Sequence, residues 1–230
     1  RQEAKEALIK SWHEGFQTLP EKNSLMLTYS NRDANDLNHT ARTLLKESDH
    51  IKRQEFTCTV AKMVDDDFGK KRTIREEKNF SKGDRIVFSR NNYGLGVKNG
   101  TMGTITDLNK QTIQVKLDEG KEVAFSPNLN PYFDQGWVIT IHKSQGTTVD
   151  QTYLLASFEM TQNLAYVAMT RHREDVQVYG SSLDFWRPEK LPEILSKSGE
   201  KLSAGDYLGA DSLNKLMQKD DHLITKIFDR

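Results

Sequence analysis

The sequence has little cysteine, no long apolar run and no recognisable export signal. Its single cysteine, Cys58, excludes an internal disulfide and is typical of a protein from a reducing compartment. No apolar run approaches the roughly 20 residues that a membrane-spanning helix needs. The N-terminal residues also lack the apolar stretch of a signal peptide. We therefore expect a cytoplasmic protein that makes no contact with a membrane.

The chain also lacks an excess of charge of either sign. Lysine and arginine together number 33, aspartate and glutamate together number 33, and the net charge is zero. A protein that holds nucleic acid by bulk electrostatic attraction carries an excess of basic residues. Any contact with nucleic acid must therefore be local and depend on the shape of a particular surface.

Two kinds of catalytic signature are missing as well. The phosphate-binding motif G-x-x-x-x-G-K-[ST] occurs nowhere in the chain, so the chain has no P-loop of its own. The six histidines show no metal-ligand spacing with Cys58 or with the carboxylates, which argues against a metal site. There is also no recognisable nucleophile elbow or catalytic dyad.

What is present is an alternation of helix and strand patterns near both ends of the chain. Apolar side chains at helical spacing and short buried-strand runs follow one another, as in α/β proteins with a parallel sheet. The expected helices are residues 2–17, 32–47 and a helix from a Thr161 cap to about Arg173, and the expected strands are 25–29, 136–141, 152–156 and 176–179.

The middle of the chain has a different pattern. Four short strand-like runs, separated by turns rich in glycine and asparagine, follow a β-forming segment and a charged segment that we expect to be an exposed loop or hairpin. Close spacing of short strands predicts a small β-barrel inserted into the α/β domain. The runs are 84–89, 101–107, 112–117 and 122–125, after the β-forming segment 55–64 and the charged segment 65–78.

These patterns predict three regions. Residues 1–50 and 130–182 would form one discontinuous α/β domain, residues 55–128 the inserted barrel, and residues 183–230 a C-terminal helical segment. The first residue is Arg1 rather than methionine, so we expect the chain to be a fragment of a longer protein.

The segment Thr140–Gly146, TIHKSQG, follows directly on a hydrophobic run and ends in glycine. Its polar side chains can donate or accept hydrogen bonds, and a glycine permits close approach of the backbone to a phosphate or sugar. A polar turn that leaves a buried element has the same composition. The segment alone favours this simpler interpretation.

A second segment, NLAYVAMTRHRED, has an apolar stripe followed by Arg171, His172 and Arg173. Cations at the C-terminus of a helix interact favourably with its dipole, which would explain all three residues. Alternatively, Arg171 projects outward to meet a γ-phosphate, because its planar guanidinium suits phosphate oxygens. Position on a helix does not decide between the two.

Two further segments allow a structural and a functional reading. In LTYSN, Ser30 or Asn31 can cap the following helix, and polar residues at this end of a strand also lie where α/β sheets bind ligands. In GDRIVFSRNNYGLGVKNGTMG, the pair Asn99–Gly100 is a strong hairpin signal. The same segment offers charge and an aromatic face to a single strand through Arg85, Arg90, Tyr93 and Lys98.

Taken together and in this order, the four segments resemble the C-terminal motor half of superfamily 1 helicases of the RecD and Pif1 type. Among these, the chain is most similar to the helicase part of TraA-type conjugative relaxases. The resemblance covers residues 20–180, and the combination of segments is far more specific than any one of them.

The resemblance implies a role for each matching residue. Arg171 would be the arginine finger that senses the γ-phosphate, with Gln145 and Gly146 facing the nucleotide. The inserted barrel would help to guide the DNA. The residues implied to contact single-stranded DNA are Thr28, Asn31, Thr140, His142, Lys143, Arg90, Asn92 and Tyr93.

The resemblance also implies cofactors and partners. The complete motor would use ATP and Mg²⁺ held by a first motor domain that this chain lacks, so the chain alone would bind neither stably. Its partners would be single-stranded DNA and the N-terminal motor and relaxase domains of the same protein. The alternative is a non-catalytic nucleic-acid-binding or scaffold module descended from a helicase, which the missing P-loop and zero net charge favour.

Overall fold

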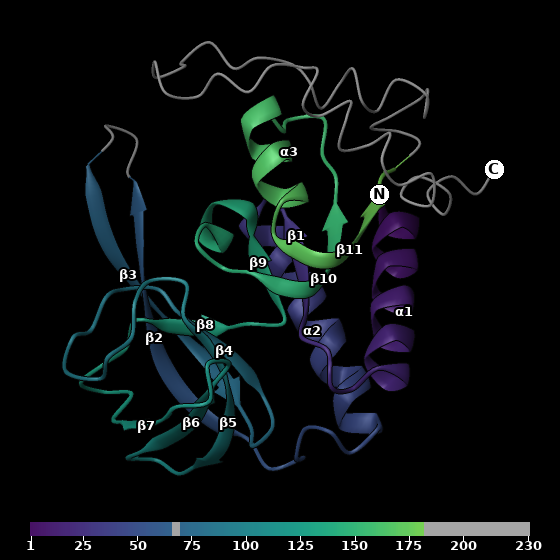
Figure 1. The fold of residues 1–230 in the computed structure, drawn as a ribbon. Helices are drawn as coiled ribbons and strands as arrows, with labels where there is room; N and C mark the ends of the chain where they lie inside the picture. Colours follow the sequence, from purple (N-terminus) through teal and green to yellow (C-terminus); the bar gives the residue numbers. More distant parts are fainter. Residues whose placement is uncertain (66–69, 182–230) are drawn as a thin grey trace. The chain divides into compact units, whose positions relative to one another are not determined.

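The computed structural model describes residues 1–65 and 70–181 of the chain (Figure 1). They form two compact units, the first made of Arg1–Leu37 together with the residues from Val138 onward, and the second of Asn38–Trp137. The division therefore falls at residues 37 and 137. The predicted C-terminal helices, 183–230, lie outside the described residues.

The first unit is built on a four-stranded sheet in which every pairing is parallel, with the strand order β11-β10-β1-β9. The predicted α/β class with a parallel sheet is confirmed. Its elements are α1 (Gln2–Thr18), β1 (Ser24–Thr28), the start of α2 (Asn31–Glu47), β9 (Val138–Thr140), the 3₁₀ helix η1 (Ile141–Ser144), β10 (Val149–Leu155), α3 (Gln162–Met169) and β11 (His172–Tyr179).

Burial explains why these residues form a central sheet. All five residues of β1 are buried, so both faces of the sheet are covered at this strand. Helix α1 (Figure 1) packs against β1, β10 and β11. Leu8 and Trp12 of its apolar stripe are completely buried. The Trp12 indole N–H donates to Ser24 Oγ at 3.0 Å, which satisfies the one polar group that this side chain carries into the core.

Helix α3 ends earlier than the sequence predicts. It stops at Met169, whereas Arg171 lies in a turn and His172 already begins β11. The reason is the pairing of His172 with Val149 of β10, which requires extended backbone at this point. The Tyr166 carbonyl accepts from both the Thr170 backbone N–H at 3.0 Å and the Thr170 hydroxyl at 2.9 Å, so this carbonyl at the helix end is satisfied without another turn.

The second unit contains a five-stranded antiparallel sheet with the strand order β7-β6-β5-β4-β8 and a separate two-stranded hairpin, β2-β3. The hydrogen bonding of the described strands does not close this sheet into the barrel that the sequence predicts, because β7 and β8 remain its two edges. The strands are β2 (Phe56–Asp65), β3 (Lys71–Phe80), β4 (Arg85–Phe88), β5 (Met102–Leu108), β6 (Ile113–Leu117), β7 (Glu122–Phe125) and β8 (Phe133–Gln135).

Side chains from the hairpin and from the sheet share one apolar core. Phe80 lies 5.1 Å from Phe133 and Phe133 lies 5.3 Å from Phe125, ring centroid to ring centroid. Alternate residues of β6 point inward, as in an antiparallel sheet with one covered face. The described residues of both units contain no helix with the length and apolar character needed to cross a membrane.

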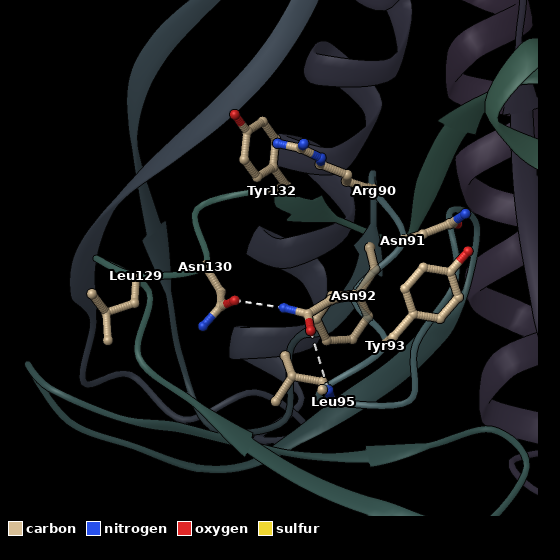
Figure 2. A pocket seen from close by; sticks show the side chains of 10 residues that line it. Arg90, Asn91, Asn92, Tyr93, Leu95, Leu129, Asn130 and Tyr132 are labelled. Carbon is tan, nitrogen blue, oxygen red and sulfur yellow. Dashed lines mark hydrogen bonds between the residues drawn. The ribbon is translucent and has the colours of Figure 1, made fainter.

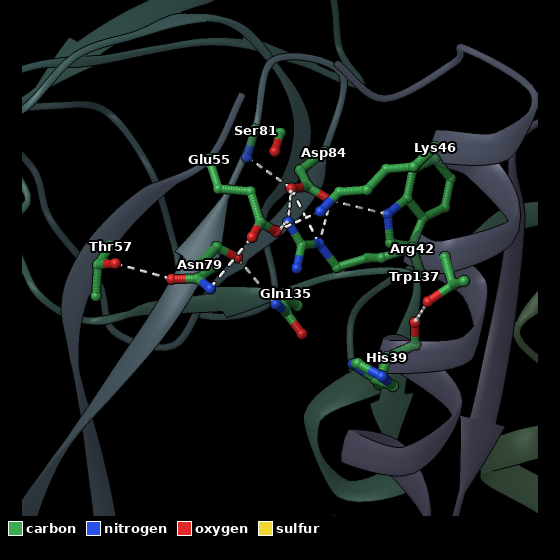
Figure 3. A network of polar contacts seen from close by, with 11 residues as sticks. His39, Arg42, Lys46, Glu55, Thr57, Asn79, Ser81, Asp84, Gln135 and Trp137 are labelled. Carbon is green, nitrogen blue, oxygen red and sulfur yellow. Dashed lines mark hydrogen bonds and ion pairs between the residues drawn. The ribbon is translucent and has the colours of Figure 1, made fainter. Parts of the chain in front are cut away.

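A buried ion pair anchors the second unit. Asp84 is fully buried, and it accepts hydrogen bonds from Arg42 Nε at 2.9 Å, from Arg42 Nη2 at 2.9 Å and from the Ser81 backbone N–H at 2.8 Å (Figure 3). Burial by itself lowers the pKa of Arg42, but the hydrogen bonds and charge of Asp84 raise that pKa above its ordinary value. The Arg42 guanidinium therefore stays charged inside the fold.

We predict that Asp84→Ala lowers the free energy of unfolding of this unit by about 3–5 kcal/mol, because it leaves the Arg42 guanidinium buried without its carboxylate. Urea unfolding followed by tryptophan fluorescence measures the change, since Trp137 lies beside Asp84. The control is Asp107→Ala, which removes an exposed carboxylate from the same unit and should change stability by no more than about 0.5 kcal/mol. Equal effects of the two substitutions would contradict the prediction.

Candidate functional site

Two of the predicted segments meet at the carboxyl edge of the parallel sheet. Strands β1 and β9 are neighbours, and Thr28 pairs with Thr140 at their ends. The chain then continues into Tyr29 on one side and into η1 on the other, where the Tyr29 and His142 rings lie 6.5 Å apart between centroids. Ligands of open α/β sheets bind at this edge, so the structure brings LTYSN and TIHKSQG together where a ligand would bind.

Side chains at this edge differ in how accessible they are. Thr28 is 0% exposed, and its hydroxyl donates to the Ser30 carbonyl at 3.0 Å. Thr140 is also buried, whereas Asn31 and His142 are exposed and Lys143 is half-buried. The two threonines therefore hold the ends of their strands, and the surface of the edge is formed by the other three side chains.

Ser30, rather than Asn31, caps helix α2. Its Oγ accepts from the Asp33 backbone N–H at 3.1 Å and donates to the Asp33 carboxylate at 2.8 Å. Asn31 is the first residue of the helix and points to solvent. The structure thus resolves an alternative that the sequence left open, and it leaves the Asn31 side chain available at the edge of the sheet.

The end of TIHKSQG is a tight turn. The Thr147 N–H donates to the Ser144 carbonyl at 2.9 Å, with Gln145 at φ −62° and ψ 122° and Gly146 at φ +88° between them. These are the angles of a type II turn, which needs a residue that tolerates positive φ at its third position. Gln145 and Gly146 are exposed, and the space beside the Gly146 Cα is open. The glycine therefore serves the turn and also leaves room for a ligand.

Arg171 lies next to this turn. Its Nη1 approaches the Thr147 carbonyl at 3.5 Å, its Nε donates to the Val167 carbonyl at 2.8 Å, and its Nη2 donates to Thr170 Oγ1 at 3.1 Å. The side chain is half-buried. A guanidinium has five N–H groups, so these three contacts with the described residues leave two N–H groups for a ligand.

The neighbouring cations are placed differently. Arg173 is exposed, and its Nη1 forms an ion pair with Asp150 Oδ1 at 2.9 Å. Since helix α3 ends at Met169, the explanation of Arg171, His172 and Arg173 as cations at a helix C-terminus is wrong for His172 and Arg173, which belong to β11. Arg171 alone reaches back toward the 144–147 turn.

In the second unit, Arg90, Asn92 and Tyr93 lie around one pocket (Figure 2). Arg85 does not contribute, contrary to the sequence analysis, because it is buried and forms a two-pronged ion pair with Asp118 at 2.9 and 2.6 Å. Lys98 is exposed, and its carbonyl accepts from the Thr101 N–H at 3.0 Å, which closes the turn predicted at Asn99–Gly100.

The pocket also contains residues that sequence reasoning missed. Leu129, Asn130 and Tyr132 complete its wall. They follow the last predicted strand of the insertion and carry no motif, so only their folding back toward residues 88–95 identifies them. The sequence contains one indication of a binding role, because Tyr132 is an aromatic residue in a loop between strands.

Comparison with known proteins places the fold in a family. The family described as viral superfamily 1 RNA helicase core domain matches residues 33–180. The chain belongs to this superfamily 1 helicase family. Its parallel sheet with flanking helices is thus the RecA-like fold expected from the sequence, with antiparallel sheets inserted between β1 and β9.

Individual relatives show which superfamily 1 helicases the chain resembles. The chain is 36% identical over 208 residues to the probable conjugal transfer protein TraA of Sinorhizobium fredii, which covers 89% of this chain and 17% of that protein. It is 30% identical over 131 residues to the ATP-dependent DNA helicase Pif1 of Bdellovibrio bacteriovorus, with 49% of this chain and 29% of that protein covered. The chain thus spans less than a fifth of the length of its TraA relative, and the resemblance to RecD/Pif1-type helicases of TraA-like proteins is confirmed.

Among solved structures, the chain is similar to Pif1 helicase from Bacteroides in complex with ADP-AlF3 and ssDNA. The two are 22% identical with a TM-score of 0.49, and the match covers 68% of this chain and 40% of that one.

Asp33 ties the start of α2 to helix α1. Its carboxylate contacts Arg1 Nη2 at 2.6 Å and Lys5 Nζ at 2.7 Å, in addition to Ser30. Burial by itself raises the pKa of Asp33, but hydrogen bonds from Arg1, Lys5 and Ser30 lower it to about 2, from an ordinary value of 3.8. The ionised carboxylate therefore stabilises the capped end of α2, directly behind the LTYSN edge.

We predict that Asp33→Asn lowers the free energy of unfolding at pH 7 by about 2 kcal/mol, the equivalent of the lowered pKa. Because the folded-state pKa is lowered, this contribution is complete above pH 4 and is lost as the pH falls from about 4 to about 2. Urea unfolding of both proteins at several pH values measures the difference, which should narrow below pH 4.

The matched control is Asp36→Asn. Asp36 also pairs with Lys5, at 2.9 Å, but its side chain is 53% exposed, and exposed pairs contribute little. A difference between wild type and Asp33→Asn that stays constant with pH would rule out the ion pairs as its source.

Proposed function

We propose that the chain is the second motor domain of an ATP-dependent DNA helicase, and that it supplies an arginine finger to ATP held by a first motor domain. One observation carries the proposal: the Arg171 guanidinium lies against the 144–147 turn, in which Gln145 and Gly146 are exposed, so the two segments predicted to face nucleotide are neighbours. Membership of the superfamily 1 helicase family and the similarity to the DNA helicase Pif1 support it.

The surface fits an anionic nucleotide. Arg171 keeps two N–H groups beyond its contacts with the protein, and a planar guanidinium suits phosphate oxygens. The open space at Gly146 and the exposed Gln145 amide adjoin it. Mg²⁺ would be held with the phosphates by the P-loop domain. Arg171 would stabilise the charge that builds on the transferred phosphoryl group.

The carboxyl edge of the sheet would contact single-stranded DNA. His142 and Asn31 are exposed there and Lys143 is half-buried, so these three can reach phosphates or bases. Thr28 and Thr140 were expected to contact DNA, but both are buried, so we assign them the positioning of the two strand ends. In the second unit, Arg90, Asn92 and Tyr93 provide a cation, an amide and an aromatic ring for single-stranded DNA.

The proposal also concerns the longer protein to which this chain belongs. The match to a TraA protein more than five times longer supports a conjugative relaxase-helicase that acts in the cytoplasm, with the relaxase and first motor domains on the rest of its chain. The non-catalytic scaffold differs from this proposal in one measurable property, since a scaffold joined to a P-loop domain would give no ATP turnover.

We predict that Arg171→Ala abolishes DNA-stimulated ATP hydrolysis when the chain is joined to the P-loop domain of its parent protein. The loss should be on the order of 10³-fold or more, the effect of removing an arginine finger. A coupled assay of ADP release with and without single-stranded DNA measures it, and unfolding curves show whether the fold is intact.

The neighbouring substitution Arg173→Ala is the control. It removes the same charge two residues away, but Arg173 is exposed and paired with Asp150, so turnover should stay at the wild-type value. Unchanged turnover in Arg171→Ala would remove Arg171 from the proposed role. Absence of turnover in the wild-type joined protein would favour the scaffold.

We also predict that the 230-residue chain alone hydrolyses no ATP, because it has no P-loop to hold the phosphates. Its rate of phosphate release should equal that of buffer, at ATP concentrations that saturate the joined motor. Turnover by the purified chain that Arg171→Ala removes would show that a second phosphate-binding element lies within these residues.

A further inference from the structure

The pocket of the second unit has a lining suited to one kind of ligand. It has a volume of about 440 Å³, within the range of small-molecule sites. Two loops that are far apart in the sequence form it, residues 88–95 and 129–132. The lining contains aromatic rings, asparagine amides and one arginine, and it contains no carboxylate.

The asparagine amides are oriented by backbone donors. Asn92 Oδ1 accepts from the Leu95 N–H at 3.1 Å, so Asn92 Nδ2 is the atom that donates to Asn130 Oδ1 at 2.6 Å (Figure 2). Asn91 Oδ1 likewise accepts from the Asn99 N–H at 2.8 Å. Each of the three amide oxygens therefore accepts a hydrogen bond within the protein, and this fixes the Asn91 and Asn130 amides so that their N–H groups can donate to a ligand.

The other polar group of the pocket is a cation stacked on a ring. The Arg90 side chain lies against the Tyr132 ring (Figure 2), and its guanidinium carbon is 4.8 Å from the ring centre. Among the described residues Arg90 has no carboxylate partner. The pocket thus presents hydrogen-bond donors and a positive charge, and a ligand that fits it carries acceptors and negative charge.

Tyr93 lies at the pocket on a small loop closed by backbone hydrogen bonds. Asn92 and Val97 form an isolated antiparallel bridge with hydrogen bonds of 2.8 and 3.1 Å, and the Gly96 N–H donates to the Tyr93 carbonyl at 3.2 Å. The ring is nevertheless 87% exposed. A large aromatic side chain that the backbone holds in water offers a face for stacking.

We propose that this pocket takes one unstacked nucleotide of a DNA single strand. The base stacks on Tyr93, its acceptor edge meets the amide N–H groups of Asn91 and Asn130, and the adjacent phosphate meets Arg90. This inference rests on the proposed function, because it assumes that the strand is DNA. It adds Asn91 and Asn130 to the residues that contact the strand, with Tyr132 positioning Arg90, and it assigns the site a base rather than the backbone alone.

The first experiment separates base from phosphate. Fluorescence anisotropy measures the affinity of the full 230-residue chain for labelled dT20 and for an abasic strand of equal length and charge. We expect Tyr93→Ala to weaken binding of dT20 roughly 5- to 100-fold, the usual range for loss of one stacked base. The same variant should bind the abasic strand as the wild type does, and Tyr93→Phe should retain wild-type affinity for both strands.

The second experiment tests the Asn130 amide by comparing two substitutions that add the same negative charge inside and outside the pocket. Asn130→Asp keeps the oxygen that accepts from Asn92, but it replaces the N–H donor by negative charge. Asn109→Asp adds the same charge in the same unit outside the pocket, where the Asn109 oxygen accepts from the Gln111 and Thr112 N–H groups. We expect weaker dT20 binding for Asn130→Asp only.

The outcomes separate the pocket from the proposed function. Equal loss of dT20 and abasic binding in Tyr93→Ala, or equal effects of Asn130→Asp and Asn109→Asp, would overturn the base pocket while leaving a DNA-binding motor. If the wild type binds dT20 and no pocket substitution weakens that binding, the base pocket is likewise overturned and the DNA-binding motor is not. No binding of dT20 by the wild type would overturn the pocket, and turnover of the joined motor would then decide the proposed function separately.

Discussion

The parallel pairing of β1 on both sides is the interaction on which the candidate site depends. Strand β1 contributes only five residues, all buried, yet its two neighbours β9 and β10 follow the whole inserted unit in the sequence. Because all three strands run in the same direction, their carboxyl ends meet at one edge of the sheet. The backbone hydrogen bonds of this ladder therefore place Tyr29 beside His142, across more than a hundred residues of chain.

The same sheet decides what Arg171 can do. Val149 of β10 pairs with His172 of β11, and the Val149 N–H donates to the Arg171 carbonyl at 3.0 Å. This pairing ends helix α3 early and turns the Arg171 side chain back toward Thr147. The carbonyls of Val167 and Thr147 then accept from the guanidinium and hold it in a half-buried position. An arginine on an uninterrupted helix would have pointed elsewhere.

The inserted unit has its own core and its own polar anchor. The phenylalanine cluster joins the hairpin to the sheet, and the Arg42–Asp84 pair fixes the backbone at Ser81. The sequences of loops attached to this core can change without disrupting its packing. Residues 88–95 and 129–132 form a pocket in which hydrogen bonds within the protein orient the asparagine amides.

The sequence by itself is sufficient for the strong local patterns. The apolar spacing of residues 2–17 and the run at 25–29 identify α1 and β1 almost to the residue, and the cap at Thr161 is recognisable from its position ahead of an apolar stripe. The order of four short segments is enough to indicate the helicase family. These features depend on neighbours in the chain, whose side-chain periodicity and capping chemistry are visible in a linear sequence.

Only the tertiary structure decided the rest. In the tertiary structure α3 ends at Met169, Thr28 and Thr140 are buried, and Arg85 pairs with Asp118. The inserted strands pair as a five-stranded sheet and a hairpin, and the predicted barrel is not confirmed. The tertiary structure also brings Asn130 and Tyr132 to the loop that carries Tyr93. Each of these outcomes depends on a partner distant in the sequence, and a hydrogen bond or ion pair between distant residues leaves no periodic trace in the chain.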